Sequence, residues 1–155
     1  MRTTDGWLRW DGVLATVSRD WTDSNQHLNM GYYLVAFDLQ TDRLWAALGL
    51  GAGLRARGLT TFAVEAWLDY QREMLEGATI GCDSRVLDFD GKRLMVEHRM
   101  FHHGEGWVSS AHEVLFLCVD IASRRVAGWP EDVLARFAEV KTGVAPRRLA
   151  MKRRG

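Results

Sequence analysis

Residues 30–48, MGYYLVAFDLQTDRLWAAL, carry the longest helical pattern of the chain. Large apolar side chains recur at spacings of three and four residues, at Tyr33, Leu34, Phe37, Leu44, Trp45 and Leu48. The preceding Asn29 is a suitable N-cap, and the following Gly49 is a suitable residue for a left-handed helix end. The sequence therefore predicts an amphipathic helix over Met30–Leu48, about five turns long.

On either side of this helix the pattern changes to the alternation that is typical of strands. Strands are expected at residues 12–17, 62–70, 78–87, 93–101 and 107–119. Asp90-Gly91 lies between two of them and is a strong hairpin signal, whereas Gly49, Gly51 and Gly53 indicate a loop after the helix. The apolar run 114–119 predicts a strand that is buried on both faces. A short helix is expected after Pro130. Strands that follow one another predict an α+β fold with an antiparallel meander sheet packed around the long helix.

Composition limits the class of protein. The chain has 155 residues, of which 47% are apolar, and 20 basic residues balance 20 acidic ones. These values predict one globular domain, residues 1–145, with a solvated basic tail at 146–155. Zero net charge argues against nucleic acid or a membrane surface as a partner. The absence of a long apolar stretch or a leader-like N-terminus predicts a cytoplasmic protein, and the isolated Cys82 and Cys118 fit a reducing compartment.

The residues just before the long helix carry the most chemistry. Residues 21–29, WTDSNQHLN, combine an acid, two amides and an imidazole where the first turn of a helix offers unpaired N–H groups. Asp23 and His27 could perform acid–base chemistry there, beside amides that stabilise an oxyanion. On the residues alone, a purely structural loop and cap is the alternative.

This segment resembles the hot-dog thioesterases that act on acyl-CoA or acyl-carrier protein. The matching residues are Asp23, Asn25, Gln26, His27, Asn29 and Tyr33. A second patch, residues 68–73, is similar to the strand that ends in the active-site glutamate of that family. The resemblance implies a hot-dog fold and a catalytic set of Asp23, Asn25, His27 and Glu73. Which carboxylate is the base stays open, because the pKa of each depends on burial.

A narrower resemblance, in residues 32–42 and 62–66, is to thioesterases of carnitine breakdown that act on betainyl-CoA. A trimethylammonium group is bound by aromatic faces and a carboxylate. The candidate substrate-binding residues are Trp21, Asn29, Tyr33, Glu65, Trp67 and Trp107. The tryptophans could instead cover the sheet or a subunit contact, and another short or aromatic acyl-CoA remains an alternative substrate.

No metal or organic cofactor is expected, because the histidines lack metal-site spacing and no nucleotide-binding motif is present. The resemblance implies acyl-CoA as the partner and a homodimer or a dimer of dimers, with sites between protomers. A non-catalytic acyl-CoA or acyl-carrier binding module on the same fold is the competing hypothesis. A dehydratase of this fold is disfavoured, since the histidine-rich helix entry of that branch is absent.

Overall fold

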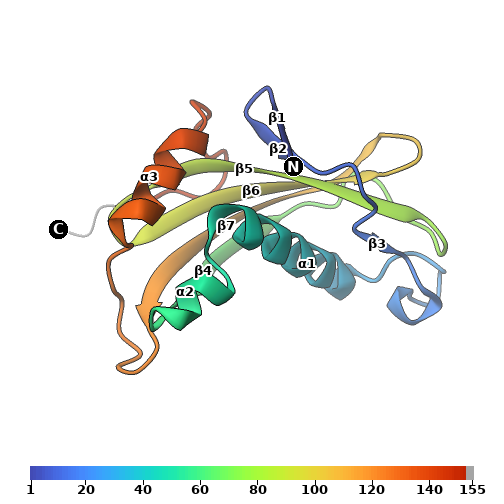
Figure 1. Ribbon diagram of the computed structural model, residues 1–155. Helices are drawn as coiled ribbons and strands as arrows, with labels where there is room; N and C mark the ends of the chain where they lie inside the picture. The colour runs from blue at the N-terminus through green and yellow to red at the C-terminus, as the bar shows by residue number, and fades with distance from the viewer. Residues whose placement is uncertain (153–155) are drawn as a thin grey trace. The chain divides into compact units, whose positions relative to one another are not determined.

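The computed structural model describes residues 1–152. The strands join one sheet in the order β1-β2-β5-β6-β7-β4, with β3 paired to β5 (Figure 1). They are β1 (Arg2–Thr4), β2 (Trp7–Arg9), β3 (Ala15–Thr16), β4 (Leu59–Leu68), β5 (Thr79–Phe89), β6 (Arg93–His102) and β7 (Val108–Asp120). The helices are the 3-10 helix η1 (Arg19–Trp21), α1 (Met30–Leu48), α2 (Ala52–Ala56) and α3 (Glu131–Val140). The predicted α+β class, with an antiparallel sheet and one long helix, is confirmed.

The long helix has the bounds that the sequence predicts. The Asn29 side-chain oxygen accepts the N–H of Gly31 at 2.9 Å, which provides an acceptor for one of the unpaired first-turn amides. Gly49 follows the last helical residue with φ at +74°, the left-handed conformation that a helix end commonly needs. Both helix boundaries are therefore set by local residues.

The predicted hairpin between β5 and β6 is also present. Its turn is closed by Asp90, whose carboxylate accepts the N–H groups of Lys92 at 3.0 Å and Arg93 at 2.8 Å. The same carboxylate pairs with the Arg93 guanidinium at 2.7 Å. Burial opposes these contacts, but together they lower the pKa of the Asp90 carboxyl.

Three short regions of the chain differ from the expectation. A hairpin of β1 and β2 forms at the N-terminus, where Asp5 and Gly6 both have positive φ. The predicted strand at 12–17 is reduced to the two residues of β3. Helix α2 replaces the loop expected around Gly51 and Gly53, and it buries Leu54 completely. Elements of two to five residues are too short to show a hydrophobic period, so tertiary burial decides them.

The chain forms two compact units, which are described separately. The first comprises Met1–Thr41, Leu68–Ser84 and His98–His112. In its core, Tyr33 and Phe37 of α1 pack with Ile80 and Cys82 of β5 and with Met100 of β6. The helical spacing of four residues between the two aromatic rings puts them on the same face of α1, as predicted.

The second unit comprises Asp42–Trp67, Arg85–Glu97 and Glu113–Gly155. Trp45 of α1 meets Phe116 of β7 edge to face, with ring centroids 4.7 Å apart. The Trp45 indole N–H donates a hydrogen bond of 3.0 Å to the Thr61 hydroxyl of β4. These contacts bury one face of β7.

The other face of β7 is covered by the end of the chain. Leu115 forms a cluster with Leu87 of β5 and Met95 of β6, and Leu149 and Met151 pack against this cluster. Because successive residues of a strand point to opposite faces, β7 needs an apolar side chain at nearly every position here. The prediction that this strand is buried on both faces is confirmed.

Residues 147–151, here called the C-terminal strap, are held by two buried acids. The fully buried Glu113 carboxylate accepts the backbone N–H groups of Arg147 and Arg148, each at 2.9 Å, and of Leu149 at 3.0 Å. The buried Glu97 accepts the Arg147 guanidinium at 2.9 Å. Hydrogen bonds to ionised groups are stronger than neutral ones, so the strap is firmly anchored.

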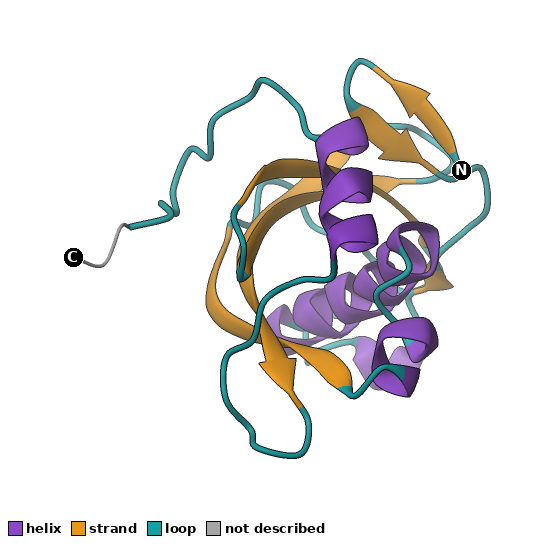
Figure 2. Cartoon of the chain, turned by 60° about the vertical axis from the view of Figure 1, so that its left-hand side comes forward, coloured by secondary structure: helices purple, strands orange, loops and turns teal. Residues whose placement is uncertain are grey.

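The expectation of a solvated basic tail at residues 146–155 stays a prediction. The chain after α3 runs as a loop (Figure 2), in which Arg147 and Arg148 are exposed. Leu149 and Met151 pack against the Leu115 cluster. Arg153 and Arg154 of the predicted tail lie outside the described residues. The assignment of residues 1–145 to one domain stays a prediction.

A buried polar chain runs through the first unit. The Gln40 amide donates to the Ser84 hydroxyl at 2.9 Å, and this hydroxyl lies 2.7 Å from Nδ1 of His98. Nε2 of His98 lies 3.0 Å from the Thr41 hydroxyl, which donates to the Phe37 carbonyl at 3.0 Å. Because the Thr41 hydroxyl donates its proton to the Phe37 carbonyl, it can only accept from His98. His98 therefore donates from Nε2 to Thr41 and accepts at Nδ1 from the Ser84 hydroxyl. Both imidazole nitrogens of His98 are therefore satisfied when the ring is neutral.

We expect acid to destabilise the fold through His98. Burial, and then the nearby His112, lower the pKa of His98 well below its ordinary value. In the unfolded chain His98 therefore becomes protonated near pH 6.5, whereas in the folded chain it stays neutral at that pH. The contribution of neutral His98 to the free energy of unfolding is present above pH 6.5 and is lost as the pH falls. Chemical denaturation should show the free energy of unfolding falling by up to about 1.4 kcal/mol per pH unit below that point.

The matched variants for this measurement are His98→Gln and His103→Gln, since His103 is partly exposed. The slope should flatten in the first variant and stay as in wild type in the second. An unchanged slope in His98→Gln would contradict the assignment.

Among the described residues, no helix is both long enough and apolar enough to span a membrane.

Candidate active site

The Asp23 side chain holds the loop before α1 in its conformation. Oδ1 of Asp23 accepts the N–H of Asn25 at 2.9 Å and of His27 at 3.2 Å, while the Asp23 N–H donates to the His27 carbonyl at 2.9 Å. Gln26 turns the chain with φ at +63°. One carboxylate oxygen of Asp23 is thus used to hold the loop that presents His27.

Backbone hydrogen bonds join this loop to the segment before β5. The N–H of Leu28 donates to the Met74 carbonyl at 2.8 Å, and the N–H of Glu76 donates to the Gln26 carbonyl at 3.2 Å. This pairing places Nε2 of His27 3.1 Å from Oε2 of Glu73. Their side chains are 34% and 67% exposed, so the pair is reachable from solvent.

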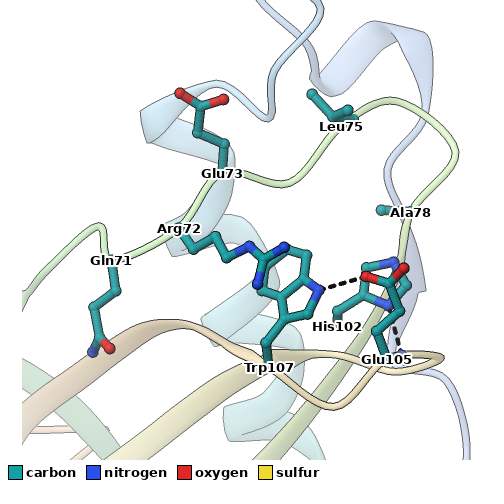
Figure 3. Close-up of a pocket in the computed structure, with 8 residues that line it drawn as sticks. All are labelled: Gln71, Arg72, Glu73, Leu75, Ala78, His102, Glu105 and Trp107. Atoms are coloured by element: carbon teal, nitrogen blue, oxygen red, sulfur yellow. Dashed lines mark hydrogen bonds between the residues drawn. The ribbon is translucent and has the colours of Figure 1, made fainter.

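A cleft of about 600 Å³ lies beside this pair. It is lined by Gln71, Arg72, Glu73, Leu75, Ala78, His102, Glu105 and Trp107. In Figure 3, Glu73 and Leu75 lie at one end and Trp107 and Glu105 at the other, with the Arg72 side chain over the Trp107 ring. The cleft therefore has an acid at one end and an aromatic ring with a second acid at the other.

The turn between β6 and β7 supplies residues that the sequence analysis missed. The Trp107 indole donates to a Glu105 carboxylate oxygen at 2.5 Å, and the Glu105 N–H donates to Nδ1 of His102 at 3.0 Å. The indole hydrogen bond, helped by His102 and Arg72, lowers the pKa of the Glu105 carboxyl. The only sequence signal that could have indicated Glu105 and His102 as site residues is their position close to Trp107 in the chain.

The other aromatic candidates of the first unit are mostly packed. Tyr33 is buried and meets Tyr70 edge to face with centroids 4.9 Å apart. Trp21 stacks on Tyr32 at 5.4 Å. The Asn29 side-chain oxygen caps α1, as described above. None of Trp21, Asn29 and Tyr33 lines the cleft.

Two further candidates belong to the second unit. Glu65 lines a different cavity, of about 740 Å³, beside Lys92 and Leu117. The Arg148 guanidinium lies 5.1 Å from the Trp67 ring centroid. The structure thus brings Glu73 and Trp107 to one cleft, with His27 in contact with Glu73, but it does not place Glu65 or Trp67 among the residues lining that cleft.

No group of three or more His, Cys, Asp or Glu side chains within residues 1–152 could hold a metal ion. The side chains that line the cleft offer an imidazole, two carboxylates, a guanidinium and an indole.

The family model described as the thioesterase-like superfamily matches residues 17–137. The chain belongs to this superfamily. That stretch contains the capped loop, α1, all the long strands and the turn with Glu105, so the whole cleft lies within the part shared with the family. The predicted hot-dog fold and the predicted thioesterase class are confirmed.

Curated relatives of this thioesterase-like chain carry more specific names. A betainyl-CoA thioesterase of Pseudomonas aeruginosa is 35% identical over 118 residues, which cover 76% of this chain and 74% of the relative. An L-carnitine dehydrogenase/betainyl-CoA thioesterase of Agrobacterium fabrum is 31% identical over 116 residues. That match covers 75% of this chain but 24% of the longer relative, so the chain spans about a quarter of the two-activity protein.

Solved structures agree on the fold. A putative thioesterase from Pseudomonas putida has a TM-score of 0.72 at 29% identity, over 90% of this chain and 92% of that one. A Staphylococcus aureus protein solved in complex with CoA has a TM-score of 0.78 at 22% identity, over 99% and 97% of the two chains. The second likeness shows the shared fold alone.

Proposed function

We propose that this thioesterase-like protein hydrolyses small acyl-CoA thioesters and that betainyl-CoA is its substrate. The observation that carries the proposal is the 3.1 Å contact of His27 with Glu73 beside a cleft of about 600 Å³. The 35% identity to a betainyl-CoA thioesterase over three quarters of both chains supports this choice of acyl group.

In the proposed mechanism Glu73 removes a proton from water as it attacks the thioester carbonyl carbon. The first-turn N–H groups of Gly31 and Tyr32 already donate to Asn29, so in this mechanism other N–H groups at the start of α1 donate to the oxyanion that forms. Collapse of this intermediate breaks the C–S bond, and the departing CoA sulfur takes a proton from His27 or from the protonated Glu73. Each turnover consumes one water and releases one carboxylic acid and one thiol.

The remaining candidates have supporting roles in this proposal. Asp23 keeps His27 in position through the loop contacts, and Asn25 orients water or the acyl group. Trp107 contacts the acyl head group. The assignments of Trp21, Asn29, Tyr33, Glu65 and Trp67 to substrate binding stay predictions.

The competing proposal is a binding module that holds acyl-CoA without cleaving it. A pure binder has no need of an imidazole and a carboxylate in contact at the mouth of the cleft, so the His27–Glu73 pair favours the enzyme.

The experiment is a thiol-release assay on a panel of CoA thioesters. The panel contains betainyl-CoA, its neutral isostere tert-butylacetyl-CoA, acetyl-CoA and benzoyl-CoA. Betainyl-CoA should have the highest kcat/KM. Binding of the thioesters without release of CoA would support the binding module instead, and a preference for benzoyl-CoA would replace the proposed acyl group.

We further propose a homodimer, or a dimer of dimers, built on β4. In the sheet order β4 is the last strand, and Phe62 and Val64 on it are 63% and 46% exposed. An apolar edge strand of ten residues is an exposed pairing surface. Pairing of residues 60–72 across a twofold axis would cover it.

Light scattering at micromolar concentration should therefore give at least twice the 17.6 kDa chain mass. Val64→Lys should shift the population toward monomer, whereas Val144→Lys, at another exposed apolar position, should not. A wild-type monomer that is fully active would contradict this proposal.

A cytoplasmic place of action and a role in carnitine metabolism complete the proposal. Cys82 and Cys118 are both buried free thiols, which fits a reducing compartment. The names of the relatives support the metabolic role.

A further inference from the structure

The Trp107 ring already holds a cation. The Arg72 guanidinium carbon lies 4.1 Å from the ring centroid, within the range of a cation–π interaction. The ring is fixed on one edge, because its indole N–H donates to Glu105 at 2.5 Å. A positive charge over this ring therefore has an ionised carboxylate beside it as well as an aromatic face beneath it.

The backbone of Arg72 is fixed, but its side chain is free to move. Its N–H donates to the Ser109 carbonyl at 3.2 Å, and its carbonyl accepts the Ser109 hydroxyl at 2.6 Å. The guanidinium, in contrast, is exposed over the ring, where such contacts are weak. Arg72 can thus leave the Trp107 ring by side-chain rotation without disturbing Glu73, the next residue.

We propose that Trp107 and Glu105 form the binding site for the cationic head of the acyl group, and that Arg72 occupies this site until substrate displaces it. This inference rests on the proposed function, since it takes the acyl group to be a quaternary ammonium. The cation of betainyl-CoA is one methylene away from the reacting carbonyl carbon. Its site must therefore lie near the catalytic acid, and Arg72, the residue next to Glu73, reaches the Trp107 ring of the same cleft with its side chain.

Arg72 is then a specificity-determining residue that acts by occupying the site of the substrate cation. A neutral acyl group gains no cation–π contact from the ring, so it leaves the guanidinium in place and binds beside it. A quaternary ammonium must displace the guanidinium, so its own cation–π contact is offset by the loss of the Arg72 contact. Removal of Arg72 should therefore help the cationic substrate more than the neutral one.

The first test is kinetic and uses the ratio of kcat/KM for betainyl-CoA to that for tert-butylacetyl-CoA. Arg72→Met should raise this ratio about three- to tenfold, and Glu105→Gln and Trp107→Leu should lower it by a similar factor, mainly through KM. Arg99→Met is the matched control, because the Arg99 guanidinium lies 4.1 Å over Trp7 and lines no part of the cleft. A ratio that falls or stays constant in Arg72→Met overturns the inference.

The second test needs no activity, so it separates failure of the inference from failure of the proposed function. Calorimetry with tetramethylammonium chloride should show tighter binding to Arg72→Met than to wild type. Adding Glu105→Gln or Trp107→Leu to that variant should abolish the gain, and either double variant suffices if the other does not fold. Tight binding of the cation without betainyl-CoA hydrolysis would keep the site and reject the proposed substrate. Hydrolysis of betainyl-CoA with no gain in cation binding in Arg72→Met would keep the proposed substrate and reject the cation site.

Discussion

Replacing Glu73 with glutamine should lower kcat by at least about 100-fold while changing KM much less. Glutamine keeps the size and the hydrogen-bonding oxygen of Glu73 but cannot accept a proton from water. His27→Ala should cause a comparable loss, because the imidazole contacts the same carboxylate at 3.1 Å. The double variant should be little worse than either single one, as expected for two groups that act as a unit. Single-turnover thiol release measures all three.

The control is Glu76→Gln, three residues further along the same segment. The Glu76 side chain is exposed and does not line the cleft, so this variant should retain wild-type turnover. Near-normal kcat in Glu73→Gln, with normal folding, would remove Glu73 from the mechanism.

Asp23→Asn decides which carboxylate is the base. An asparagine oxygen at this position can still accept the N–H groups of Asn25 and His27, so the loop should survive. A loss of kcat in Asp23→Asn would then report the missing charge and not a disordered loop. We expect this loss to be at least tenfold smaller than that of Glu73→Gln, and the opposite order would make Asp23 the base.

The sequence predicted the elements whose signals are local. The bounds of α1 follow from Asn29 and Gly49 at its two ends, and the turn between β5 and β6 follows from Asp90. The family resemblance implied that His27 and Glu73 belong to one site between protomers, whereas the structure shows the two side chains in contact within one chain. Backbone pairing of the loop with the segment before β5 brings the two residues together although they are far apart in the chain.

Only part of the proposed cation site could be predicted from the sequence. Trp107 was a candidate because of its aromatic face, but Arg72 comes from a segment 35 positions earlier and Glu105 was assigned to a turn. Their convergence depends on the Ser109 contacts that hold the Arg72 backbone beside β7. Neither the hydrophobic periodicity of the sequence nor a local motif predicts such a long-range contact.

The C-terminal strap could not be predicted from local sequence for a related reason. Glu97 and Glu113 look like ordinary polar residues on strands, and residues 147–154 look like a basic tail. A carboxylate is rarely buried without partners, so these acids require donors. Arg85 of β5 pairs with one oxygen of Glu97, and the strap supplies the donors for the other oxygen and for Glu113.

We expect Glu113→Gln to lower the free energy of unfolding by about 2–3 kcal/mol. The carboxylate serves the N–H groups of Arg147, Arg148 and Leu149 with its two oxygens. A glutamine presents one oxygen and one NH₂ group, so at least one N–H then faces another donor. The strap should detach, and Leu115 beneath it should become exposed.

Limited trypsin digestion followed by mass spectrometry checks this directly, because Arg147 and Arg148 are cleavage sites that the strap contacts protect. Glu113→Gln should be cut there at least tenfold faster than wild type. Glu139→Gln is the matched control, since Glu139 forms an exposed ion pair with Arg136 on α3, and such pairs contribute little to stability. Equal cleavage rates and equal unfolding free energies in Glu113→Gln and wild type would mean that the apolar contacts of Leu149 and Met151 hold the strap without the carboxylate.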